Sequence, residues 1–208
     1  MKIRMLTLIL ALAICVCAAG ALAEGRTIAP VVREIDVETL PDGVYPVAFD
    51  PDDVRPEGDG IMLNVRVYAR DVYDSADVDA LQVGDVIVVE GEDVEVLTME
   101  RDAYGVTVNA EQDARAFYLV WNEEEGGYVV QGMNDLGTYT ELGAAALAVA
   151  PGASFTDGWD IEKDPVTVAY DDIEEAIRAT ENDAFVPDNA TVRVQDGRVA
   201  EIVRAYMP

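Results

Sequence analysis

Four carboxylates gather in one short segment of the chain, FTDGWDIEKD. Hard cations such as Ca²⁺ take roughly six to eight oxygen ligands, and one acidic loop can supply several of them. The spacing differs from that of an EF-hand loop, which needs ligands at alternate positions, a central glycine and a closing glutamate. The segment therefore predicts a candidate Ca²⁺ site, with a solvated acidic loop as the alternative, at Asp157, Asp160, Glu162 and Asp164.

A second acidic group lies in the segment DPDDVRPEGDG, residues 50–60. Its prolines and glycines indicate a turn-rich loop. The oxygen chemistry is the same but the pattern is weaker, so it predicts a secondary Ca²⁺ candidate at Asp50, Asp52, Asp53, Glu57 and Asp59.

Both tryptophans lie beside carboxylates. Trp159 sits inside the first acidic segment, and Trp121 immediately precedes NEEEGG. An exposed aromatic ring can stack on a sugar face while neighbouring carboxylates accept hydrogen bonds from the hydroxyl groups. The pair predicts candidate ligand-binding residues for a glycan; a role as core or loop anchors is the alternative, above all for Trp121, which follows an apolar run.

The residue types that are missing narrow the chemistry. The chain has no histidine, and its only cysteines, Cys15 and Cys17, lie in the N-terminal apolar run. A Ser-His-Asp triad, a Cys-His dyad and an ordinary zinc site are therefore excluded. Ser154 and Lys163 share a segment, but a catalytic lysine must be desolvated, which a polar loop does not provide. Paired carboxylates roughly 5–10 Å apart, as glycoside hydrolysis requires, stay open.

The formal net charge is −27, from 41 acidic and 14 basic residues. A surface of this charge repels nucleic acids and anionic lipid headgroups, which bind through lysine and arginine clusters. It attracts cations and basic proteins, and it also favours solubility in salty surroundings. We expect no nucleic-acid partner, and we keep a basic protein and an extracellular glycan as candidate partners.

The N-terminus has the pattern of an export signal. Lys2 and Arg4 precede an apolar run over residues 5–19, and small residues occupy the positions that a signal peptidase reads at Ala21 and Ala23. The sequence predicts a signal peptide over 1–23 and a secreted, extracytoplasmic domain over 24–208. The apolar run is shorter than a membrane span, and no later stretch is long enough, so no transmembrane span is expected after cleavage.

The chain from residue 24 onward is typical of a mainly β fold. Ile61–Arg70 gives the clearest pattern, because apolar residues alternate there with polar ones as in a half-buried strand. Further short apolar runs separated by turn residues predict small barrel- or sandwich-like sheets and hairpins. Residues 151–164 read as a long polar loop. A weak echo between two strand-turn segments suggests two related halves divided near 112.

One α-helix is expected in the C-terminal half, over about 172–181. Asp171 can cap it, with Glu174 completing a capping box, and the apolar residues recur at helical spacing.

The chain ends in a predicted hairpin whose turn is Asp196-Gly197. A two-residue turn pairs Val194 with Val199. Continued without interruption it would also place Glu201 on the apolar face, so we expect a bulge near Ala200–Glu201 that returns Ile202 to the core.

The segments YDSADVDALQVGDVIVVEGEDVEV and FVPDNATVRVQDGRVAEIVRAYMP resemble those of small secreted β-rich proteins of anaerobic Gram-positive bacteria. The resemblance covers the exported chain in outline. It implies a secreted β-rich domain and assigns no catalytic or ligand-binding residue.

These observations favour a secreted, non-enzymatic binding module, with Ca²⁺ as a candidate stabilising ion. Two alternatives remain. A carboxylate-dependent hydrolase of glycans or the cell wall requires an inward-facing acid pair in a cleft, with one pKa raised by burial. A structural or inhibitory protein would present a flat acidic face to a basic partner.

Overall fold

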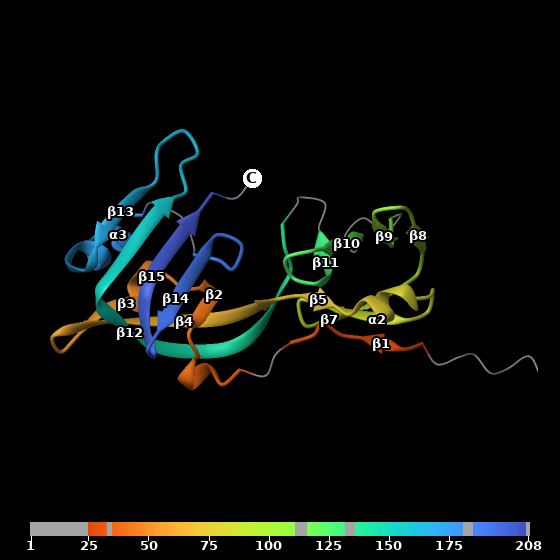
Figure 1. Cartoon of the computed structure of the whole chain (residues 1–208), viewed down its shortest axis with the longest axis horizontal. Helices are drawn as coiled ribbons and strands as arrows, with labels where there is room; N and C mark the ends of the chain where they lie inside the picture. The colour runs from red at the N-terminus through yellow and green to blue at the C-terminus, as the bar shows by residue number, and fades with distance from the viewer. Residues whose placement is uncertain (1–24, 33–34, 111–115, 132–135, 181–184, 207–208) are drawn as a thin grey trace, which may run out of the picture.

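The computed structural model describes residues 25–32, 35–110, 116–131, 136–180 and 185–206. The predicted signal peptide, with both cysteines, lies outside the described residues. Within them, no helix is long and apolar enough to cross a membrane. The fold is mainly β, as predicted, and its strands form three sheets (Figure 1).

The strands vary greatly in length. Those of the first half of the chain are β1 Thr27–Ile28, β2 Gly43–Ala48, β3 Val54–Glu57, β4 Gly60–Arg70, β5 Val72–Tyr73, β6 Val86–Val89, β7 Glu92–Glu95, β8 Met99–Arg101 and β9 Gly105–Val108. Those of the second half are β10 Phe117–Asn122, β11 Gly127–Gln131, β12 Tyr139–Gly158, β13 Val166–Ala169, β14 Ala190–Gln195 and β15 Arg198–Ala205. The short helical elements are η1 Val37–Thr39, η2 Pro51–Asp53, α2 Ser75–Asp79, η3 Tyr170–Asp172 and α3 Ile173–Arg178.

The largest sheet closes into a five-stranded barrel, which we call the barrel lobe. Its strands follow the order β2-β4-β12-β15-β14 and return to β2. All neighbours are antiparallel except β12 and β15, which are parallel. In chain order, α3 lies between the third and fourth barrel strands, β12 and β14. The barrel therefore has the connectivity of an OB-fold.

Alternation along β4 explains how the barrel fills its interior. Leu63, Val65 and Val67 are buried, whereas Arg66 between them is exposed. The period of two places successive side chains on opposite faces of the sheet, so the odd positions enter the barrel core and the even ones face outward. The strand predicted over Ile61–Arg70 is therefore confirmed with this in-and-out assignment.

The segment read as a polar loop over residues 151–164 is largely a strand. β12 continues to Gly158, and Ala153 and Phe155 are both buried. The sequence prediction was wrong here because proline, glycine and serine interrupt the apolar pattern. The strand persists because its second half is paired on both sides, with β15 and with β13.

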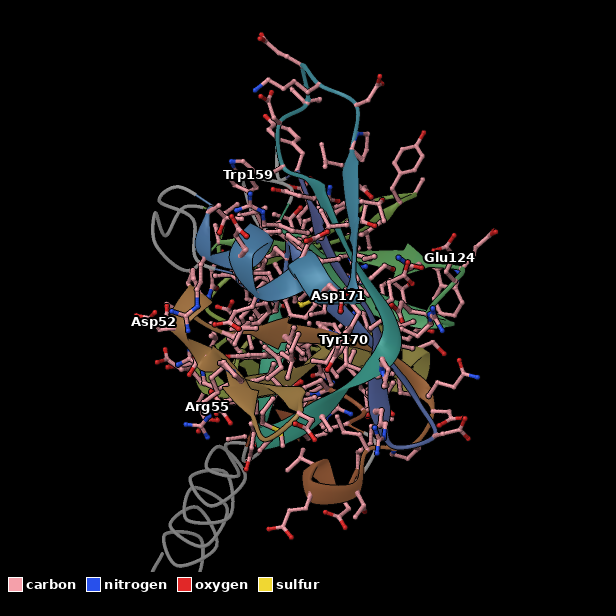
Figure 2. All side chains as sticks on the ribbon, turned by 90° about the vertical axis from the view of Figure 1, so that its left-hand side faces the viewer. Asp52, Arg55, Glu124, Trp159, Tyr170 and Asp171 are labelled. Carbon is pink, nitrogen blue, oxygen red and sulfur yellow. The ribbon has the colours of Figure 1, made fainter. Side chains whose placement is uncertain are left out.

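The predicted C-terminal helix is present but shorter than expected. α3 ends at Arg178 and follows a 3₁₀ turn that contains Asp171, so Asp171 lies one residue before the N-cap position (Figure 2). Asp172 takes the N-cap position and makes no side-chain capping hydrogen bond, so the expected capping box with Glu174 is absent. Ile173 and Ile177 are buried, which shows that packing on the barrel, rather than capping, stabilises this helix.

The C-terminal hairpin is confirmed in detail. Val194 pairs with Val199 and Arg193 with Glu201, which leaves Ala200 as the extra residue of a bulge. Ile202 is fully buried. Asp196 and Gly197 both have positive φ, at 53° and 69°, as a two-residue turn of this kind requires.

The chain between β4 and β12 forms a second body, the inserted lobe, comprising residues 72–131 and β1. It has its own apolar core, which includes Tyr73, Ile87 and Leu119. The two cores lie side by side and are joined through β4–β5 and the start of β12 (Figure 1). Residue 112, where two halves were expected to divide, is outside the described residues, and strands β9 and β10 on either side of it pair within one sheet.

One close approach in the inserted lobe gives a stability prediction. A Cβ atom added at Gly105 would overlap the Leu119 carbonyl oxygen and come within 2.9 Å of the Tyr118 ring. We expect Gly105→Ala to lower the free energy of unfolding by about 2 kcal/mol, because overpacking displaces backbone. The matched control is Gly152→Ala, where a Cβ meets no atom within 4 Å. Urea unfolding of both variants checks this, and equal stabilities would contradict the close contact.

Candidate functional site

The outward-facing residues of β4 form a polar row on the surface of the barrel. Asn64, Arg66, Tyr68 and Arg70 occupy alternate positions, opposite in direction to the buried core residues. Arg66 is exposed, and the others are partly exposed. The row therefore places an aromatic ring between two guanidinium groups along one strand.

β12 flanks this row with small side chains. Ala144 pairs with Arg66, and Ala146 pairs with Asn64. Because alanines stand where larger residues would fill the space, they leave a groove of about 530 Å³ over the two strands. Asp50 and Asp53 form its opposite wall.

A second hollow, of about 540 Å³, follows along the same strand. Tyr68 and Arg70 line it on one side, and Val44 of β2 lines it on another. Glu125, from the β10–β11 turn of the inserted lobe, also contributes to its lining. Tyr68 and Arg66 are two residues apart on the same face, so the two hollows are neighbours along β4. We call this surface, with the row of β4 and the alanines of β12, the β4–β12 face.

On this face the Tyr68 hydroxyl lies among side chains of both charges, in a chain that is otherwise strongly acidic. Burial raises the pKa of the Tyr68 hydroxyl, Arg66 lowers it, and Glu141 raises it through its charge and a 3.3 Å hydrogen bond from that hydroxyl. The net effect is a raised pKa, so Tyr68 remains a neutral hydrogen-bond donor and a flat apolar surface at ordinary pH.

The sequence-predicted residues Asp157 and Trp159 form a clamp around a buried arginine instead of an open site. Arg204 donates to both oxygens of Asp157, over 2.9 and 2.7 Å. The guanidinium also lies between Trp159 and Phe185, with its central carbon 5.5 and 5.3 Å from the ring centroids. Tyr206 packs against Trp159 from the side.

This clamp fixes the ionisation of its carboxylate. Burial raises the pKa of Asp157, but hydrogen bonds from Arg204 and from the Trp159 backbone N–H, with the charge of Arg204, outweigh it and lower the pKa below its ordinary value. The resulting stabilisation is present above about pH 4, the ordinary range of an aspartate, and is lost as the pH falls through the lowered pKa. Trp159 and Asp157 thus act together in holding the end of β12 against β15.

The other predicted Ca²⁺ ligands are dispersed. Asp160 forms an exposed ion pair with Lys163 at 2.6 Å, and Glu162 and Asp164 are exposed. In the secondary candidate, Asp53 accepts a hydrogen bond from the Asp50 backbone. Across the described ranges, no three His, Cys, Asp or Glu residues are grouped so that they could hold a metal ion.

The two tryptophans lie far apart in the fold. Trp121 is on β10 of the inserted lobe, 45% exposed, with its ring edge-on to Tyr128. Trp159 lies at the base of the β12–β13 hairpin of the barrel lobe (Figure 2). They therefore cannot form one sugar-binding platform together. Ser154 is on β12, whereas Lys163 is exposed and paired with Asp160, so the Ser/Lys pair is not assembled.

Carboxylates also gather where the two lobes meet, at positions the sequence analysis did not single out. Asp71 is fully buried; its side chain accepts hydrogen bonds from the Thr140 hydroxyl at 2.6 Å and the Glu90 backbone at 2.8 Å. Partial burial, followed by the charges of Asp71, Asp188 and Glu92, raises the pKa of Glu90. Burial also raises the pKa of Asp188, against the effects of the Gly137 backbone and Arg70. Neither Glu90 nor Asp188 lines the two hollows of the β4–β12 face.

Sequence reasoning missed the β4–β12 face, although it identified the strand. It assigned the outward residues of Ile61–Arg70 only as the polar side of a half-buried strand. A usable signal was present: Arg66 and Arg70 flank Tyr68 at alternate positions in a chain that is poor in basic residues. The flanking alanines could not be recognised, because their register with β4 is a tertiary property.

Comparison of the chain with protein-family models, curated proteins and solved structures finds no match.

The arginine clamp gives a stability prediction. Arg204 is only 4% exposed, so replacing Asp157 removes a carboxylate that holds a buried guanidinium through two hydrogen bonds. We expect Asp157→Asn to lower the free energy of unfolding by about 3 kcal/mol at pH 7. The matched control is Asp160→Asn, whose ion pair is exposed and whose loss should change stability by less than about 1 kcal/mol. Denaturant unfolding measures both, and a smaller loss for Asp157→Asn than for the control would contradict the clamp.

The raised pKa of Glu90 gives a pH prediction. The native state holds this proton to a higher pH than the unfolded state, so ionised Glu90 destabilises the fold above the raised pKa. Glu90→Gln should be more stable than the wild type at pH 7, by less than about 1 kcal/mol. The advantage should shrink as the pH falls toward about 4, where unfolded glutamate takes up its proton. Urea unfolding at a series of pH values tests this against Glu100→Gln on exposed β8; matching pH profiles for the two variants would refute it.

Proposed function

We propose that this chain is a secreted, non-enzymatic binding module that holds a glycan on the β4–β12 face. The observation that carries the proposal is the groove of about 530 Å³, whose floor is lined by small side chains and whose edge is lined by polar ones. Alanines allow a sugar chain to approach the strand backbones closely. Asn64 and Arg66 supply donors, and Tyr68 supplies a flat ring on which a sugar can stack.

The position of the groove adds support by analogy. Five-stranded barrels of this connectivity bind oligosaccharides and oligonucleotides on the face of their second and third strands. Here those strands are β4 and β12. Fold alone does not give function, so the analogy supports the place of binding and the side chains support the class of ligand.

A glycan fits this face better than a nucleic acid does. Asp50 and Asp53 line the groove, and Glu125 lines the neighbouring hollow. Carboxylates accept hydrogen bonds from sugar hydroxyls but repel a backbone that carries a phosphate at each nucleotide. The formal net charge of −27 adds to that repulsion.

The proposal includes neither hydrolysis nor a calcium ion. Neither Glu90 nor Asp188, the carboxyl groups with raised pKa values, lines the two hollows of the β4–β12 face. The predicted calcium ligands Asp157 and Asp160 are engaged by Arg204 and Lys163. Binding by itself is the role that the described geometry favours.

The test is a glycan-binding measurement with variants of the face. Tyr68→Ala should weaken binding to an immobilised glycan panel by about tenfold, because it removes the stacking surface. Ala146→Leu should weaken it independently by filling the groove. Binding can be measured by biolayer interferometry with purified protein.

The control is Tyr104→Ala, at a tyrosine that is 78% exposed on the inserted lobe. It should bind as the wild type does. Thermal melting of each variant separates loss of binding from loss of fold. Unchanged binding by both face variants, or failure of the wild type to bind any glycan on the panel, would sink the proposal.

A further inference from the structure

We propose that the glycan held by the β4–β12 face is acidic, with carboxylate or phosphate groups spaced well apart along the chain. This inference rests on the proposed function and names the ligand class. It is carried by arginines that form no ion pair or side-chain hydrogen bond within the described chain, by their spacing, and by the carboxylates set among them.

Most cations of the described chain already have partners. Arg26, Arg178 and Arg193 form ion pairs with carboxylates, as do Lys163 and Arg204. Arg101 donates to backbone carbonyl groups. The described arginines without such partners are therefore the candidates for binding an anionic ligand.

Within the described residues, the arginines that form neither an ion pair nor a side-chain hydrogen bond are Arg55, Arg66, Arg70 and Arg198. All but Arg198 lie on β3 and β4. Arg55 pairs with Met62, an outward-facing residue of β4, so its side chain stands on the same side of the sheet as those of Arg66 and Arg70. Figure 2 shows Arg55 well away from Trp159.

The arginines are spaced rather than clustered. Arg66 and Arg70 are four residues apart on one strand, which corresponds to about 13 Å. Met62, the neighbour of Arg55, lies the same number of residues from Arg66 in the other direction. Charges at this interval match substituents that recur every few sugars and do not match a phosphate on each successive nucleotide, where charges are several-fold closer.

Carboxylates occupy the positions between and beside the arginines. Glu141 faces Tyr68 across the ladder, Asp53 lines the first groove together with Arg66, and Glu125 lines the second hollow together with Arg70. An extended ligand must therefore present hydroxyl donors to these carboxylates and anionic groups to the guanidinium groups. An acidic glycan carries both kinds of group along one chain.

The negative charge of the remaining surface disfavours densely charged polyanions further. This charge repels any polyanion at a distance, with a range of about 8 Å at physiological ionic strength. Contacts at hydrogen-bond distance are screened much less by salt. Guanidinium groups bind carboxylates and phosphates at that distance with two parallel hydrogen bonds. A sparsely charged glycan is repelled only weakly at long range and still forms these short contacts.

The experiment compares three probes of the same length with purified protein: hyaluronan oligosaccharides, with a carboxylate on every second sugar; heparin oligosaccharides, which are densely sulfated; and neutral β-glucan oligosaccharides. Isothermal titration calorimetry gives the affinity at low and at physiological salt. We expect hyaluronan to bind most tightly, and its affinity to fall as salt rises.

Arg66→Gln and Arg70→Gln should each lower the affinity for hyaluronan by roughly fivefold at low salt and reduce its salt dependence. Arg198→Gln is the matched control, because Arg198 is exposed and also without an ion pair among the described residues but lies on β15. It should leave the affinity unchanged. Melting curves confirm that each variant is folded.

The outcomes separate this inference from the function on which it rests. If neutral oligosaccharides bind as tightly as hyaluronan and the arginine variants bind normally, the acidic ligand is wrong while glycan binding stands. If heparin or a single-stranded DNA probe binds more tightly than hyaluronan, the spacing argument fails. If none of the oligosaccharides binds, both proposals fail.

Discussion

The structure depends on the double pairing of β12. Its first half pairs antiparallel with β4, and its second half pairs parallel with β15 and antiparallel with β13. One continuous strand thereby closes the barrel, since it is the only element in the described chain that contacts both β4 and β15 as a ladder neighbour. Closure removes the open edges that an isolated sheet would expose. The register shift between Glu141 and Gly143, where Gly143 has a φ of 141°, lets the strand curve as closure demands.

The same strand positions both polar features of the barrel lobe. Its alanines border β4 and leave room above Arg66 and Asn64, while its far end carries Asp157 to Arg204. One end is thus open and sparsely filled, and the other is closed by a buried ion pair between aromatic rings. Trp159, the more suggestive tryptophan in the sequence, belongs to this closed end. Its ring covers a guanidinium that Asp157 has already neutralised, so the aromatic surface is used within the fold.

A buried carboxylate, Asp71, connects the two lobes at their junction. Asp71 accepts hydrogen bonds from β12 and from the β6–β7 turn, which ties the inserted lobe to the barrel through one side chain. Burial raises the pKa values of Glu90 and Asp188 at this junction, and the charges of Asp71 and Asp188 raise that of Glu90 further. Two separate apolar cores, held by such a polar junction, allow each lobe to pack independently.

The sequence by itself determined the features that depend on local periodicity. The alternation in β4, the turn at Asp196-Gly197 and the bulge at Ala200 followed from the period of a strand and the conformational freedom of glycine. The helix near residue 173 followed from its apolar spacing, although its cap did not, because a preceding 3₁₀ turn moved its start. The tertiary structure decided which strands are neighbours, and therefore which residues meet. Asp157 forms an ion pair with Arg204, which follows it by 47 residues in the chain. Asn64 of β4 lies opposite Ala146 of the neighbouring strand β12. Such contacts depend on strand register, which is set by closure and core packing over the whole chain and leaves no local trace in the sequence.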